Sequence, residues 1–293
     1  MPLNNLNENR HILCGTDELI GKQLGNHKHG TVGKRLNKAP LNFNPRKLLE
    51  AMIAEIENNL ERAWKLSRRQ PPEVVLGKSA QNWRQMRPTK EHDKRKPERE
   101  FEHRLADAGK NDEDWIWWNQ MPIASGLVGH RADRTRAIDL VCKQRKAGTS
   151  YHRFIELKIN RNAGAPLAAL MEILRYGLVY FVLRKNQRAE WLKDTSLDSL
   201  IFKANHIDLC VLAPRSYYKD YQLAWLEKSL TSALNEIFDD LLGDGELEMN
   251  LSSYWPGPLE TWDMKDKNFF QNLLKNDNDL KSILKDWKPA FPD

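Results

Sequence analysis

The sequence predicts an α/β fold in which helices flank a mixed central sheet, and three observations support this class. A helical pattern at residues 97–109 precedes three strand-like segments between residues 114 and 159. A second, long and apolar helical pattern at residues 165–183 comes before a short apolar strand at residues 207–213. A strand, a long helix and a further strand in that order predict a parallel, right-handed crossover, whereas strands joined by a short turn pair antiparallel.

The first helix of this series has well-marked ends. Pro97 suits the first helical position, and Gly109 suits the end of a helix. Phe101 and Leu105 belong to its apolar stripe. The next segment, residues 114–124, is rich in tryptophan and is expected to be an internal strand whose tryptophans pack in the core rather than stack on bases.

Residues 136–160 hold the pattern on which the functional prediction depends. They read as two short strands joined by a basic, glycine-containing turn. Because strand side chains alternate between faces, Glu156 and Lys158 share a face, and Asp139 can join them across the hairpin while Ile138 points to the opposite, apolar face. Two carboxylates beside an ammonium group suit a divalent cation that activates water.

An aspartate, a spacer and then Glu-x-Lys on the next strand resembles the PD-(D/E)XK nuclease superfamily. Asp139, Glu156 and Lys158 match its motif, with sixteen residues between the two acids. Ile138 stands where the name of the motif has proline, a frequent departure in the family. The resemblance covers roughly residues 97–214 and implies a restriction-endonuclease-like core of order α-β-β-β-α-β, with an N-terminal helical extension and C-terminal helices outside it.

The resemblance also implies a role for each residue of the motif. Asp139, Glu156 and the backbone carbonyl of Leu157 would ligate Mg²⁺, a hard ion that prefers oxygen, and Mn²⁺ would substitute for it. Lys158 would orient or deprotonate the attacking water and stabilise the negative charge that develops. Proximity to the metal and to other cations could lower the pKa of Lys158.

Members of the superfamily bring one further acid into the site from the first helix. The run Glu-Arg-x-Phe is similar to the start of Holliday-junction resolvases, in which the first glutamate is the functional one, so Glu98 is the first choice as a metal ligand. Glu102 is the second choice, because it lies one helical turn further on the same face. A solvent-facing, salt-bridged helix surface is the alternative for both acids. From the helix at residues 165–183, Arg175 could lie near the metal.

The charge of the chain is on the side expected for a protein that binds a polyanion, with a formal net charge of +6. Basic residues crowd the approach to the motif and surround it, and they could neutralise phosphates, although a solvated face is the plainer interpretation of any one cluster. DNA is favoured over RNA by the resemblance alone. The candidate nucleic-acid contacts are Lys94, Arg95, Lys96, Arg134, Arg136, Lys143, Arg145, Lys146 and Arg175.

The rest of the sequence divides into three regions around this core. Residues 1–96 form an extension with one long helix, capped by Asn44, and a basic linker. Residues 97–255 form the nuclease-like domain, which is expected to end in a helix and an added edge strand. Residues 256–293 form a tail that looks helical between residues 266 and 284 and carries no chemistry.

The sequence also bears on location. Three scattered cysteines suit a reducing compartment, and the N-terminus lacks the layout of a secretory signal, so the cytoplasm is expected. The longest apolar stretch is interrupted by Glu172 and Arg175, which argues against a membrane span.

Together these patterns predict a metal-dependent endonuclease that cleaves DNA, in restriction, phage defence or repair. The alternative is a catalytically inactive protein of the same fold that binds nucleic acid or serves in an assembly. The regions outside the motif could supply target recognition or the interface of a homodimer.

Overall fold

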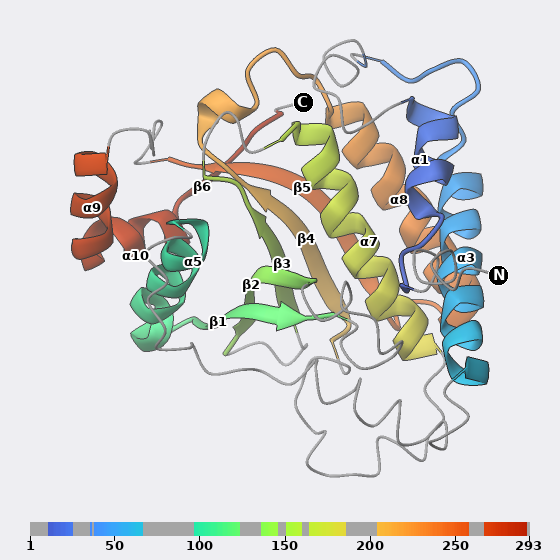
Figure 1. Ribbon diagram of the computed structural model, residues 1–293, viewed down its shortest axis with the longest axis horizontal. Helices are drawn as coiled ribbons and strands as arrows, with labels where there is room; N and C mark the ends of the chain where they lie inside the picture. Colours follow the sequence, from blue (N-terminus) through green and yellow to red (C-terminus); the bar gives the residue numbers. More distant parts are fainter. Residues whose placement is uncertain are drawn as a thin grey trace, which may run out of the picture.

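The computed structural model describes residues 11–25, 36, 38–66, 97–123, 136–145, 151–159, 164–185, 204–257 and 267–291. Its centre is a mixed sheet of six strands in the order β1-β2-β3-β4-β5-β6 (Figure 1). β1, β2 and β3 pair antiparallel, β3, β4 and β5 pair parallel, and β6 pairs antiparallel with β5. The strands are β1 Trp115–Pro122, β2 Ala137–Gln144, β3 Tyr151–Leu157, β4 His206–Leu212, β5 Glu248–Pro256 and β6 Trp287–Pro289. The predicted α/β class with a mixed sheet flanked by helices is confirmed.

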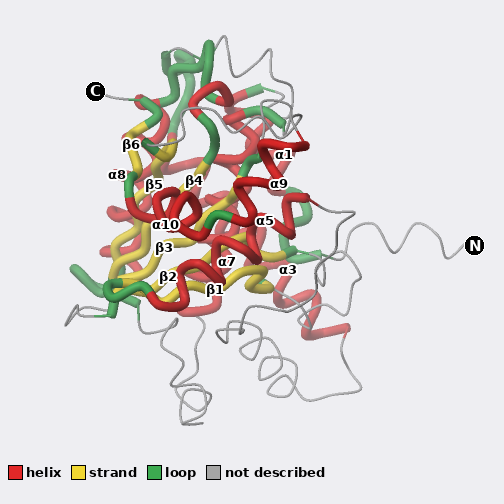
Figure 2. Tube along the Cα trace, turned by 90° about the vertical axis from the view of Figure 1, so that its left-hand side faces the viewer, coloured by secondary structure: helices red, strands yellow, loops and turns green. Residues whose placement is uncertain are grey.

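Helices cover both faces of the sheet, as Figures 1 and 2 show. Those on one face are α1 Thr16–Leu24, α3 Pro45–Leu66, α7 Pro166–Lys185 and α8 Ala224–Leu242, and those on the other are α5 Pro97–Ala108, α9 Lys267–Lys275 and α10 Asp277–Lys285. Two buried apolar clusters correspond to these two faces. α3 packs on α7 and α8, and α10 packs on α5, so helices from the N-terminal and C-terminal regions join the layers on the two faces.

Several predicted helix ends have a visible cause. The backbone N–H of Lys47 donates to Asn44 Oδ1 at 2.9 Å, so Asn44 caps α3 as expected. The helical stretch expected in the tail is divided into α9 and α10, because the side chain of Asn276 accepts hydrogen bonds from the backbone N–H groups of Asn278 and Asp279 and starts α10. The short strand β6 that follows was not predicted.

Within the described residues, α7 is the one helix long and apolar enough to cross a membrane by length and composition, with a mean hydropathy of 1.5. Of the window that passes this test, 83% is buried inside the fold. The core helix of a globular fold passes the same test.

Two predictions about the first strands are wrong. β1 was expected inside the sheet but lies at its edge, although Trp117 and Trp118 are buried by the flanking layers. Ile138 was expected opposite Asp139, on the face of Leu140, but it packs in the cluster that contains Val141. The in-and-out alternation of β2 therefore reverses at Asp139, and the reason lies in the neighbouring strand, as described below.

Candidate functional site

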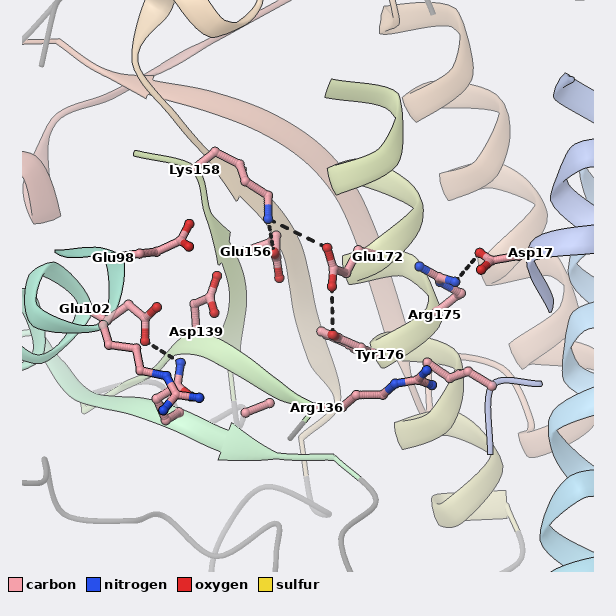
Figure 3. A pocket seen from close by; sticks show the side chains of 14 residues that line it. Asp17, Glu98, Glu102, Arg136, Asp139, Glu156, Lys158, Glu172, Arg175 and Tyr176 are labelled. Carbon is pink, nitrogen blue, oxygen red and sulfur yellow. Dashed lines mark hydrogen bonds and ion pairs between the residues drawn. The ribbon is translucent and has the colours of Figure 1, made fainter. Parts of the chain in front are cut away.

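A cavity of about 440 Å³ opens at the end of the sheet where β2 begins and β3 ends. Acids from four elements turn into it: from α5 on one side, from β2 and β3 in the middle and from α7 on the other side (Figure 3). The lining contains six carboxylates and four basic side chains. They are Asp17, Glu98, Glu102, Asp139, Glu156 and Glu172, and Arg99, Arg136, Lys158 and Arg175.

The pairing of β2 with β3 ends where the cavity begins. Leu140 and Ile155 are the last paired residues at this end. Beyond them, Asp139 Oδ2 accepts a hydrogen bond of 2.8 Å from the backbone N–H of Leu157. The N–H and C=O groups of one strand residue point to the same side, so the carbonyl of Leu157 also points towards β2. Asp139 and the Leu157 carbonyl, both predicted as ligands, thus border the same gap between the strands.

Asp139 and Glu156 are carboxyl groups with little access to water. Glu156 is 4% exposed, while Asp139 keeps part of its surface open to the cavity. Burial raises the pKa of Asp139 well above its ordinary value, and the charge of Glu102 adds to the rise. Burial and the charge of Asp139 likewise raise the pKa of Glu156. Both carboxyls therefore bind a proton more readily than they would in water, and the charge of Lys158 opposes this.

Lys158 is the basic residue nearest to this pair. Its Nζ forms an ion pair with Glu156 and lies 3.7 Å from Glu172 Oε2. Burial lowers the pKa of Lys158, but the charges of Glu156, Glu172 and Asp139 outweigh it and hold the pKa above the ordinary value. In the absence of a metal, the carboxylates around the lysine thus raise its pKa, whereas the lowering was expected from a bound metal and other cations. Lys158 is an ammonium ion here.

Both candidate acids of α5 face the cavity. Glu102 is 1% exposed, and its Oε2 accepts a hydrogen bond from the side-chain amide of Gln120. Burial raises the pKa of Glu102 to about 8, and the charges of Glu98 and Glu156 contribute. Burial also raises the pKa of Glu98. The solvent-facing alternative for these two glutamates does not apply, since both line the cavity.

α7 supplies two cavity residues that were not predicted as functional. Glu172 lies beside Lys158, and Tyr176 donates its hydroxyl proton to Glu172 Oε1 at 3.0 Å. Arg175, the residue of α7 that was expected near the metal, instead forms an ion pair with Asp17 of α1 (Figure 3). In the sequence, Glu172 stands out only as an interruption of an apolar stretch. Its position at i−4 from a tyrosine is a weak signal that could have singled it out.

The predicted nucleic-acid contacts are scattered. Arg136 lines the cavity and donates to His11 Nδ1 at 3.0 Å. Lys143 and Arg145 lie at the far end of β2, where Arg145 donates to the carbonyls of Asp112 and Trp115. They are not around Asp139, because β2 runs away from the cavity before the chain turns back. The other candidates lie outside the described residues: Lys94, Arg95, Lys96, Arg134 and Lys146.

In the part of the chain that the structure describes, no three His, Cys, Asp or Glu side chains are arranged as a ready-made metal site. The cavity contains several carboxylate oxygens, but they are not arranged to coordinate a single ion. Comparison of the chain with family models, with curated proteins and with solved structures found no match.

Proposed function

We propose that this protein is a metal-dependent nuclease of the PD-(D/E)XK type that hydrolyses phosphodiester bonds of DNA. The observation that carries the proposal is the meeting of Asp139, Glu156 and Lys158 in one polar cavity. The element order α5-β1-β2-β3-α7-β4 agrees with the restriction-endonuclease-like core that the resemblance implies. Asp139 and Glu156 share this cavity because β2 begins next to the end of β3.

The donor set fits a hard divalent cation such as Mg²⁺ or Mn²⁺. Asp139, Glu156, the carbonyl of Leu157 and either Glu98 or Glu102 offer only oxygen atoms, which these ions prefer. Burial raises the pKa of the carboxyls, which shows how poorly the protein alone compensates their charge. A bound cation would supply that charge, polarise a phosphate oxygen and favour ionisation of a water. The side chains would have to draw together to hold it.

Lys158 contributes a positive charge rather than a base. Its ammonium group, held between Glu156 and Glu172, can donate a hydrogen bond to a water or to a phosphate oxygen. Negative charge builds up on the non-bridging oxygens as the phosphodiester bond breaks, and a donor already in place stabilises it without reorganisation. Of the two roles predicted for Lys158, orienting the water needs the ammonium form, which the metal-free site favours.

Cleavage assays test this proposal directly. The purified chain is incubated with single-stranded, duplex and branched DNA in Mg²⁺, in Mn²⁺ and in chelator, and cleavage is expected only with a metal. Asp139→Asn should abolish it. The matched control is Glu227→Gln, which replaces another poorly solvated acid, on α8 and outside the cavity, and should cleave normally. DNA binding without cleavage under every metal condition would favour the inactive relative of this fold instead.

A further inference from the structure

The edge strand β1 is distorted at one residue, Gln120. Its backbone has a φ of 51°, in the left-handed region that side chains other than glycine, asparagine and aspartate rarely adopt. Asn119 pairs with Leu140 and Met121 with Ile138, but no pair joins Gln120 to the residue between those two, Asp139. The irregular residue of β1 therefore stands opposite the acid that the site is built on.

This distortion explains why the alternation reverses in both strands. Trp118 and Met121 lie three residues apart, yet both pack in the cluster on the α7 face. Val141 and Ile138, their partners in β2, do the same. In a regular strand, residues three apart point to opposite faces. The change of phase thus occurs together at Gln120 and Asp139.

The side chain of Gln120 reaches the cavity from this position. Its amide Nε2 donates to Oε2 of Glu102, a contact between β1 and α5. Left-handed backbone at a residue other than glycine is unfavourable and persists only where the surroundings enforce it, often at functional sites. Glycine would adopt this φ at no steric cost but has no amide to offer.

We propose that Gln120 is a positioning residue, which directs the carboxylate of Glu102 towards Asp139 so that both can ligate one divalent cation. This inference rests on the proposed function. The amide occupies one oxygen of Glu102 and leaves the other for the ion. Groups that orient metal ligands in this way commonly contribute a factor of ~10 to 100 to metal affinity.

The test measures Mn²⁺ binding by calorimetry, without substrate, together with thermal melting in chelator. Gln120→Gly removes the amide and relieves the backbone, so it should melt no lower than the wild type yet bind Mn²⁺ roughly tenfold more weakly or worse. In the Glu102→Gln background, the same substitution should change Mn²⁺ affinity no further. Asp220→Gly is the matched control, because Asp220 also has a positive φ, of 73°, but does not line the cavity.

The Mn²⁺ affinities distinguish the positioning role of Gln120 from the proposed function of the protein. Wild-type Mn²⁺ affinity in Gln120→Gly would show that only the backbone of residue 120 matters, and the positioning role would be wrong while the proposed function stands. A wild type that binds no Mn²⁺ would remove the proposed function and this role together. If Gln120→Gly does not fold, Gln120→Asn, which tolerates the left-handed backbone but has a shorter side chain, should show the same loss of affinity; unchanged affinity there would overturn the role.

Discussion

The metal-free protein should lose stability as the pH rises, and Glu102→Gln should remove much of that loss. Glu102 is 1% exposed, and burial raises its pKa from 4.5 to about 8, with the charges of Glu98 and Glu156 contributing. A carboxyl with a higher pKa in the folded than in the unfolded protein binds protons more tightly when folded. Its contribution to stability is therefore greatest at or below pH 4.5 and declines as the pH rises towards 8.

The magnitude follows from the two pKa values. Between them, each pH unit costs about 1.4 kcal/mol of unfolding free energy. From this group alone, the loss is roughly 3 kcal/mol at pH 6.5 and roughly 4 kcal/mol at pH 8. For a chain of this size, ~3 kcal/mol lost between pH 5.5 and pH 8 lowers the melting temperature by roughly 6 to 12 °C.

Thermal melts of the wild type and of Glu102→Gln, from pH 5.5 to pH 8, measure this directly. In chelator, the melting temperature of the wild type should fall as the pH rises. That of the variant should fall less steeply, because Asp139, Glu156 and Glu227 still contribute to the slope. Mg²⁺ should restore the wild type at pH 8, because a ligand that binds only the folded state stabilises it, and should affect the variant much less.

The control is Glu227→Gln. Burial raises the pKa of Glu227 to about 8 as well, so this variant should also flatten the pH dependence. Glu227 does not line the cavity, and its loss should leave the Mg²⁺ effect intact. The reasoning fails if Glu102→Gln keeps the pH slope of the wild type, or if Mg²⁺ stabilises both variants equally.

Three further predictions concern Lys158 in the cavity and two residues outside it, His206 and Gly177. Lys158→Met should lower the single-turnover cleavage rate by roughly 100-fold or more, because a preset donor to the developing charge is lost; retained metal-dependent cleavage would contradict this role. The hydrogen bond that His206 donates to Asp208 raises the pKa of His206, outweighing burial, and Glu248 contributes. The stabilising effect of His206 should therefore be full below pH 6.5 and vanish as the pH passes its folded-state pKa. Histidine NMR titration and melts of His206→Gln check this. Gly177→Ala should lower the free energy of unfolding by about 1 to 3 kcal/mol, because the added Cβ would meet Leu209 Cδ1 at 2.6 Å. Urea unfolding measures this, with Gly21→Ala as the control because a Cβ there has open space.

Local patterns predicted the elements well because their signals are local. The capped start of α3 at Asn44 and the proline start of α5 are short-range features, and both occur where expected. The alternation of β3 placed Glu156 correctly against its apolar neighbours. The same rule misplaced Ile138, because the alternation of β2 reverses opposite the irregular residue Gln120 of the neighbouring strand β1.

The contribution of α7 could not be predicted for a different reason. The helix is buried on nearly every side, so its sequence has no polar stripe to mark the face turned to the cavity. Glu172 and Arg175 were therefore equivalent in the sequence, and only packing against α1 gives Arg175 to Asp17 and leaves Glu172 beside Lys158. The distant position of Arg145, in contrast, follows from the direction of the hairpin alone.

The bond between Leu157 and Asp139 makes one peptide group a reporter of the chemistry next to it. An amide proton that donates to a carboxylate experiences a different field when that carboxylate is neutral, ionised or shared with an ion. The ¹H–¹⁵N resonance of Leu157 should therefore move with each of these changes, while an amide within the regular ladder, such as that of Ile155, should not. The protonation and metal binding of the cavity can thus be followed spectroscopically without a substrate.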